Sequence, residues 1–310
     1  MLYLKERPFL PGAVWHTLFA KSGLNTVEST KALVNDSFFG AIEGNWQAGG
    51  IEREELKQIF QIGLVEPIFC IGGIMRRQSI NPHDFDRENR ERSLRRLEKL
   101  IDQAYALNAK QIVLCSGSDV GPERRESAKE IFAETLSHLC RYAVEHAPAE
   151  PLWLGLEHFD REFDQKRLLG PSAETAAFID ELARDHFNIG ITLDLSHLKQ
   201  LGEEIRPAVR AVKRHLIHVH IANCGVDPRY PELCGDTHPR FGIEGGAVTV
   251  EDVITFLDEI ANQAYLSKKV PTRLPVISFE IKPVAGEDPL GLIANGKRVL
   301  AEAVQRINQT

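Results

Sequence analysis

The chain has 310 residues, a formal net charge of −7 and a hydrophobic fraction of 43%. This length suits one globular domain with a sizeable core, and no run of about 18 apolar residues predicts a membrane-spanning helix. Charges within residues 1–7 interrupt the segment where a signal peptide needs its apolar part, so we do not expect secretion. The acidic balance argues against a nucleic-acid partner, because phosphate binding depends on clustered Lys and Arg.

Two minor features agree with these exclusions. The densest basic run, residues 87–96, alternates with glutamates and is interpreted as the solvated face of a helix with opposite-charge pairs. Five cysteines are scattered without Cys-x-x-Cys spacing: Cys70, Cys115, Cys140, Cys224 and Cys234. Such an odd set indicates reduced thiols in a cytoplasmic protein rather than a disulfide framework.

Short apolar runs alternate with segments of helical periodicity along most of the chain. We expect strands near residues 9–15 and at 38–45, 67–72, 111–116, 152–157, 189–194, 215–221 and 276–281. We expect helices around 94–104, 131–139, 253–260 and 293–307, where apolar residues recur every three or four positions. Pro289 suits the first turn of a helix, and Ser172 suits an N-cap. Eight strands alternating with helices predict an α/β fold, a (β/α)8 TIM barrel that forms a single domain over residues 1–310.

Four strands share a second pattern, in which aliphatic residues alternate with small or polar ones. These strands close on Glu157, Asp194, His220 and Glu280. Neighbouring side chains of a strand point to opposite faces, so the aliphatic face suits packing against outer helices. In a parallel barrel the carboxyl ends of the strands meet at one mouth. The pattern therefore predicts that four polar side chains converge there.

An open, doubly wound sheet is the competing architecture. It predicts a Gly-x-Gly-x-x-Gly loop after the first strand. The chain offers only Gly72-Gly73 and Gly117, without that spacing. The barrel is therefore favoured.

Two glutamates, an aspartate and a histidine at one mouth predict a divalent-metal site, for Mn²⁺ first or for Mg²⁺, Co²⁺ or Zn²⁺. Each residue alone has an ordinary explanation. Asp194 could cap the helix that contains His197, and His220 could be a hydrogen-bonded core histidine. Glu157 and Glu280 could pair with Lys or Arg. The coincidence at four strand ends favours the metal.

With these residues in place, the sequence resembles the xylose-isomerase-like TIM-barrel superfamily over about residues 35–305. The resemblance is carried by Leu156-Glu157, by 193–197 (LDLSH), by 218–223 (HVHIAN), by 235–242 (GDTHPRFG) and by 279–283 (FEIKP). This superfamily groups sugar isomerases and epimerases, keto-sugar lyases and apurinic endonucleases. The motifs are specific for the superfamily and not for one reaction.

The resemblance implies that Glu157, Asp194, His220 and Glu280 bind a single metal ion and that His197 contacts substrate. A metal bound across a carbonyl and its neighbouring hydroxyl lowers the cost of an enediolate. Two carboxylates on opposite sides of the substrate can then move a carbon-bound proton, which makes Glu157 and Glu280 the catalytic pair. The expected function is a metal-dependent sugar isomerase or epimerase acting on a ketose, keto-sugar or polyol derivative.

Other polar and aromatic residues near the strand ends have two readings. Lys282 could neutralise negative charge on the substrate or form a salt bridge to a carboxylate at the mouth. Trp15 and Trp46 could stack on a sugar face or pack in the core, and Glu43 is equally ambiguous.

The long segment of roughly 28 residues after His220 suggests a shaped, functional loop. We expect Asp236, His238 and Arg240 to contact substrate or neighbouring groups. Arg240 could hold a carboxylate or phosphate through its bidentate fork, or form only a surface salt bridge.

The motif Asp236-x-His238 also occurs in the apurinic endonucleases of the superfamily, within a multi-metal cluster. Those enzymes bring histidines from earlier strands, where this chain has Cys70 and Cys115. The next histidine, His83, lies in a polar segment beyond the third strand. The missing ligands and the acidic net charge both argue against cleavage of nucleic acid.

Two further classes remain as alternatives. A keto-sugar lyase (a dehydratase, a decarboxylase or a glycoside-cleaving enzyme) would use the same metal and carboxylates. A non-catalytic sugar-binding barrel would show no metal-dependent turnover. We expect a small-molecule partner and no membrane partner, and a homo-oligomer is only a family-level expectation.

Overall fold

The computed structural model describes residues 1–20 and 22–309. Eight parallel strands close into a barrel: β2 (Arg7–Val14), β3 (Ala41–Gly44), β4 (Glu66–Cys70), β5 (Gln111–Cys115), β6 (Trp153–Glu157), β7 (Ile189–Asp194), β8 (Leu216–Ala222) and β9 (Val276–Glu280). Closure comes from parallel pairing of β2 with β9, with Leu10 opposite Val276. The short strand β1 (Leu2–Leu4) pairs antiparallel with β2 at the edge. The predicted TIM barrel is confirmed.

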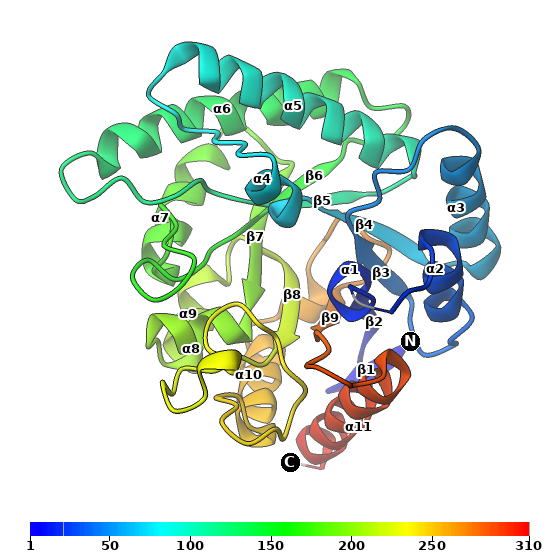
Figure 1. The fold of residues 1–310 in the computed structure, drawn as a ribbon. Coiled ribbons are helices and arrows are strands. Elements are labelled where there is room, and N and C mark those ends of the chain that lie inside the picture. The colour runs from blue at the N-terminus through cyan, green and yellow to red at the C-terminus, as the bar shows by residue number, and fades with distance from the viewer. Residues whose placement is uncertain (21, 310) are drawn as a thin grey trace.

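Helices surround the strands as an outer ring (Figure 1). They are α1 (Trp15–Leu18), α2 (Thr26–Val34), α3 (Gly50–Gly63), α4 (Gly72–Arg77), α5 (Arg87–Ala106), α6 (Arg125–Glu145), α7 (Ser172–Leu182), α8 (Leu195–Leu201), α9 (Ile205–Val212), α10 (Val250–Asn262) and α11 (Pro289–Asn308). None of the helices in the described part of the chain is long and apolar enough to cross a membrane.

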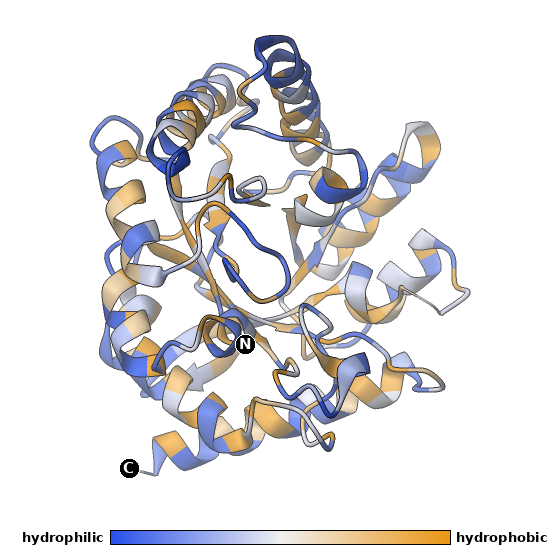
Figure 2. Cartoon of the chain, turned by 60° about the vertical axis from the view of Figure 1, so that its left-hand side comes forward, coloured by the Kyte–Doolittle hydropathy of each residue, from blue (hydrophilic) through white to orange (hydrophobic). Residues whose placement is uncertain are grey.

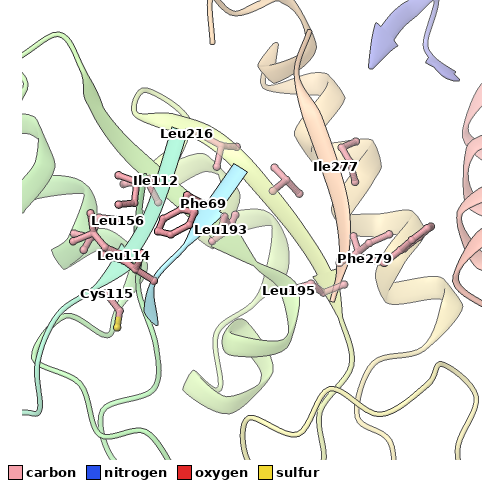
Figure 3. Close-up of a cluster of buried hydrophobic side chains, with 14 of the residues drawn as sticks. Phe69, Ile112, Leu114, Cys115, Leu156, Leu193, Leu195, Leu216, Ile277 and Phe279 are labelled. Carbon is pink, nitrogen blue, oxygen red and sulfur yellow. The ribbon is translucent and has the colours of Figure 1, made fainter. Parts of the chain in front are cut away.

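The aliphatic faces of the strands form the main core with the helices. Ile191 and Leu193 of β7 are fully buried in this core, together with helical residues such as Leu257. Figure 3 shows such side chains from β4 to β9, and Figure 2 shows helices striped with hydrophobic and hydrophilic residues around largely hydrophobic strands. Each fully buried Leu or Ile contributes about 1.5–3 kcal/mol relative to leaving it exposed. This face therefore holds the barrel together.

The alternate residues of each strand, whose side chains point to the other face, fill the inside of the barrel. A separate apolar cluster contains Leu10, Ala41, Ile68, Cys70, Val113 and Val276. Gly12 and Ser278 face each other across the closing strands, and a Cβ on Gly12 would lie 2.1 Å from the Ser278 Oγ. A larger residue at position 12 would therefore require the Ser278 side chain to move.

The helix punctuation is confirmed at one position and wrong at the other. Pro289 is the first residue of α11, behind the N-cap Asp288. Ser172 is the first helical residue of α7 rather than its N-cap, which is Pro171. The Ser172 N–H and Oγ–H both donate to Glu203, at 3.0 and 2.5 Å. The first turn of α7 is therefore capped by the carboxylate of Glu203, which is distant in the sequence, and not by the Ser172 hydroxyl.

The long segment 223–249 is a structured loop. Its two ends meet, since the Val248 N–H donates to Asn223 Oδ1 at 2.8 Å and the Ala247 N–H donates to the Cys224 carbonyl at 2.7 Å. Within it, the Gly225 N–H donates to the Leu233 carbonyl at 2.7 Å. The Lys282 N–H donates to the His238 carbonyl at 2.7 Å, which joins the loop to the segment that follows β9. All five cysteines are free.

Candidate metal centre and substrate cavity

A cavity of about 220 Å³ opens at the carboxyl ends of the strands. Glu157, His220 and Glu280 line it. A larger hollow of about 760 Å³ lies at the opposite end, beside Glu66 and Trp153, where β4 and β6 begin. In the described part of the chain, two groups of side chains are close enough to share an ion, and all their members lie on strands. One group consists of the four predicted ligands, which lie at the end of the barrel where the smaller cavity opens. The smaller cavity is therefore the candidate site.

The four predicted metal ligands come together. Glu157, Asp194, His220 and Glu280 each offer one ligand atom, and these atoms lie within 4.8 Å of one another. The His220 Nδ1 lies 3.2 Å from Glu157 Oε1, 3.6 Å from Asp194 Oδ2 and 3.4 Å from Glu280 Oε2. Consecutive strands β6 to β9 deliver them, each at or near its carboxyl end.

This donor set fits a divalent cation. Three carboxylates and one imidazole nitrogen suit Mn²⁺ or Zn²⁺. Asp194 also caps α8, since its Oδ1 accepts from the Ser196 N–H at 2.6 Å. Its Oδ2 is buried and has no hydrogen-bond partner, which leaves an oxygen free to bind an ion. Asp194 can therefore cap α8 with Oδ1 and still offer Oδ2 to a metal ion.

Glu43 of β3 supports His220 from inside the barrel. The fully buried carboxylate accepts from His218 Nε2 at 2.7 Å and from His220 Nε2 at 2.9 Å. With Nε2 donating to Glu43, loss of the proton from Nδ1 would direct a lone pair of His220 at the space between Glu157, Asp194 and Glu280. Burial alone raises the pKa of Glu43, but the two histidines outweigh it and hold that pKa well below its usual range. Glu43, His218 and His220 could also share an ion, but direct hydrogen bonds already join them.

The pKa values of the two catalytic candidates are shifted in opposite directions. Burial raises the pKa of Glu280 to about 7, against the lowering effect of the charges on His238 and His220. Burial also raises the pKa of Glu157, but hydrogen bonds from His197 and His220 outweigh it and lower that pKa to about 2. One carboxylate is therefore ionised at neutral pH, and the other can gain or lose a proton there.

Two histidines stand beside these carboxylates. The His197 Nε2 lies 3.6 Å from Glu157 Oε1, and the His238 Nε2 lies 3.6 Å from Glu280 Oε1. His238 also pairs with Asp236 at 2.6 Å. Burial lowers the pKa of His238, but Glu280 and Asp236 outweigh it and raise that pKa to about 10. His197, Asp236, His238 and Lys282 all line the cavity, as expected of substrate-binding residues.

The remaining substrate-binding candidate lies elsewhere. The Arg240 Nε donates to Glu287 Oε1 at 2.8 Å, and Arg240 is not among the residues that line the cavity. Of the two roles considered for Arg240, the structure contains the surface salt bridge. The tryptophans also pack rather than face the cavity, with ring centroids of Trp15 and Trp46 at 5.7 Å and Trp46 almost completely buried.

Cys70 and Cys115 end β4 and β5 and line the cavity, so the positions suggested for nuclease histidines carry thiols. Burial raises the pKa of both thiols. His83 is fully buried away from the cavity, where its Nε2 lies 3.0 Å from the Ser118 carbonyl. No histidine therefore stands at the end of either strand.

Sequence reasoning missed several residues that line the cavity. These are His16, Arg76, Arg77, Phe159, Gln165 and Arg167. All stand in segments that follow strands directly: α1 after β2, α4 after β4 and the loop after β6. Their position directly after a strand could have identified them from the sequence, because the segments that follow the strands of such a barrel form its active site.

Known proteins share this architecture. The family model for the xylose isomerase-like TIM barrel matches residues 18–273. An L-ribulose 3-epimerase structure is similar with a TM-score of 0.75 and 16% identity, covering 97% of this chain and 96% of that chain. A D-tagatose 3-epimerase-like protein has a TM-score of 0.72 and 18% identity, covering 97% and 99%. The IOLI protein with a bound zinc atom has a TM-score of 0.73 and 14% identity, covering 96% and 99%.

These identities are low, so the structural likeness shows the fold. No curated protein matches the sequence. The family model spans more than half of the chain, and the closed barrel agrees with it. The chain belongs to the xylose isomerase-like TIM-barrel family.

Proposed function

We propose that the protein is a divalent-metal-dependent isomerase or epimerase that acts on a ketose, keto-sugar or related polyol derivative. One observation carries the proposal: ligand atoms of Glu157, Asp194, His220 and Glu280 lie within 4.8 Å of one another beside a cavity. Sugar epimerases among the similar structures support the substrate class. We propose Mn²⁺ as the ion, with Zn²⁺, Mg²⁺ and Co²⁺ as alternatives. The free cysteines support a reducing compartment, the cytoplasm.

The proposed chemistry is proton transfer at a carbon next to a carbonyl. A divalent ion on the four ligands would supply positive charge that stabilises the negative charge developing as the proton leaves. Glu157 and Glu280 approach from β6 and β9, with carboxylate oxygens 3.2 and 3.4 Å from the His220 Nδ1. One carboxylate removes the proton and the other holds the proton that is returned.

The neighbouring histidines orient this pair. His197 lies beside Glu157, and His238 lies beside Glu280. A charged His238, paired with Asp236, can donate to a substrate oxygen while it keeps the Glu280 carboxylate in place. We propose that both histidines fix the hydroxyl groups next to the reacting carbon.

Deuterium incorporation from D₂O tests the proposal. The Mn²⁺-loaded protein is incubated with a panel of ketoses and keto-sugars, and incorporation at carbon is followed by NMR. We expect exchange with at least one sugar, and a loss of about 10²-fold or more in Glu157→Gln and Glu280→Gln. The control, Glu150→Gln, changes an exposed carboxylate at the other end of the barrel and keeps full exchange.

Three outcomes would contradict the proposal. A metal-loaded protein that exchanges no proton across the panel is not an isomerase of these sugars. A dehydrated, decarboxylated or cleaved product would make it a lyase that uses the same carboxylates. Incision of abasic-site DNA would make it a nuclease, although Cys70 and Cys115 at the ends of β4 and β5 argue against that class.

A further inference from the structure

We propose that Arg77, Arg167 and Lys282 form an oxyanion subsite in the cavity, so that the substrate is a sugar derivative carrying a carboxylate or a phosphate. This inference rests on the proposed function for the reaction and names the class of sugar that undergoes it. Nothing in the ligand cluster itself requires an acidic sugar. The subsite is built from residues outside that cluster.

The three cations come from different parts of the fold. Arg77 is the last residue of α4, Arg167 lies in the loop after β6, and Lys282 follows β9. All three line the same cavity as Glu157, His220 and Glu280. Three separate elements therefore contribute cations to one cavity. On a charged helix face, by contrast, cations are neighbours only because of the helical repeat.

These cations also lack acidic partners. Within residues 1–20 and 22–309, no carboxylate forms an ion pair or hydrogen bond with the side chain of Arg77, Arg167 or Lys282. Arg167 bonds only to neutral oxygens, the Ser116 carbonyl and Gln165 Oε1, both at 3.3 Å. By contrast, Arg76 on the same helix lies 3.6 Å from Asp236. Three positive charges in one cavity are therefore available to a ligand.

Arg167 is the most constrained of the three. It is only 9% exposed, and its Nε is buried without a hydrogen-bond partner. A buried guanidinium with an unmade hydrogen bond is costly unless an anion compensates it. A ligand oxyanion in the cavity would provide that compensation.

Arg77 lines the cavity, although its side chain is also exposed to solvent. Its Nη1 lies 3.2 Å from the position of a Cβ built on Gly73, which is in the first turn of the same helix and also lines the cavity. The absence of a side chain at Gly73 gives the guanidinium room to lie there. Guanidinium groups bind carboxylate and phosphate oxygens through paired N–H donors, which suits a terminal acidic group.

The test compares three sugars that differ only in their terminal group: D-fructose, D-fructuronate and D-fructose 6-phosphate. Binding to the Mn²⁺-loaded protein is measured by isothermal titration calorimetry. We expect one of the two acidic sugars to bind at least about tenfold more tightly than D-fructose, since hydrogen bonds to charged groups contribute that much. The tighter of the two identifies the acidic group as carboxylate or phosphate.

Variants then assign the effect to the subsite. Arg77→Gln and Lys282→Gln should each lower the ratio of affinities, acidic sugar over D-fructose, about tenfold. Arg298→Gln is the matched control, because it removes an exposed arginine from α11, outside the cavity. Circular dichroism checks that each variant is folded.

Two results would overturn the inference. Equal affinity for the three sugars means that the cations only balance the charge of the ligand carboxylates. A preference for acidic sugars that survives Arg77→Gln and Lys282→Gln means that the acidic group binds the metal directly.

Deuterium exchange on the same sugars separates the two proposals. Arg77-dependent binding without exchange into any sugar keeps the subsite and rejects the isomerase. Exchange into D-fructose without tighter binding of the acidic sugars keeps the isomerase and rejects the subsite.

Discussion

At the scale of single residues, Glu43 holds the Nε2 of His220, so that the Nδ1 faces the other three proposed ligands. Its carboxylate accepts from both His218 and His220, and it also accepts from the Cys70 thiol at 3.3 Å. An amide at this position can accept from only one of the two histidines, and its NH2 group would face the N–H of the other. We therefore predict that Glu43→Gln weakens Mn²⁺ binding about 10–100-fold, the usual range for a partner of a metal-bound histidine. Titration of Mn²⁺ into the metal-free protein measures this effect, and unchanged affinity would contradict it.

A matched variant separates this effect from a general loss of stability. Glu66→Gln changes a carboxylate at the start of β4, where it accepts from Arg273 at the opposite end of the barrel. Its Mn²⁺ affinity should equal that of the unchanged protein.

Metal affinity should also depend on pH through Glu280. Burial raises its pKa to about 7, so a proton must leave before the carboxylate can bind an ion below that pH. Affinity therefore falls as pH decreases, by about tenfold between pH 8 and pH 6 from this group alone. His220, whose pKa is raised well above its usual range by Glu43 and Glu157 against the effect of burial, adds to the slope. Calorimetric titration with Mn²⁺ at both pH values tests this, and a flat profile would refute it.

The sequence predicted which strand residues meet at the mouth of the barrel better than it predicted which loop residues line the cavity. Glu157 and Asp194 end strands of strict alternation, so their face and their end of the barrel follow from parity. Arg167 and Arg240 both stand in irregular segments, where no periodicity says which side chain turns inward. One lines the cavity and the other bonds Glu287.

At the scale of elements, the barrel closes where β2 meets β9. A Cβ on Gly12 would lie 2.1 Å from Ser278 Oγ, and that hydroxyl has no hydrogen-bond partner of its own. We predict that Gly12→Ala lowers the free energy of unfolding by about 1–3 kcal/mol through overpacking. In a Ser278→Ala background the same substitution should cost less, because the clashing oxygen is gone. Urea unfolding of the four proteins measures both effects, and equal costs would show that this contact does not limit closure.

Element boundaries show where local signals are sufficient and where they are not. Asp288 and Pro289 begin α11 through interactions within one turn, so the start of this helix is readable from the sequence. The start of α7 depends on Glu203, which is 31 residues from Ser172 along the chain. Contacts at that separation leave no local pattern.

At the scale of the whole molecule, the four proposed ligands come from β6, β7, β8 and β9, half of the barrel strands, so an ion bound by all four would join these strands. An ion that binds only the folded state stabilises it in proportion to the logarithm of its concentration. Free Mn²⁺ at 100 times its dissociation constant should add about 2.7 kcal/mol and raise the melting temperature by several degrees. Calorimetric scans with Mn²⁺ and with EDTA test this. Glu280→Gln should abolish the shift and Glu150→Gln should keep it, while identical scans with and without Mn²⁺ would exclude binding to the folded barrel.

The proposed ligands and the proposed subsite stand on different kinds of backbone. The carboxylates and His220 occupy strands locked into a closed sheet, whereas Arg77, Arg167 and Lys282 occupy a short helix and two connections. Evolution can therefore replace the connections without disturbing the reaction centre. Grafting the segments after β4, β6 and β9 onto a related barrel should transfer selectivity for acidic sugars while the recipient keeps its own chemistry. A lineage would in this way acquire new substrates by exchanging a few connecting segments.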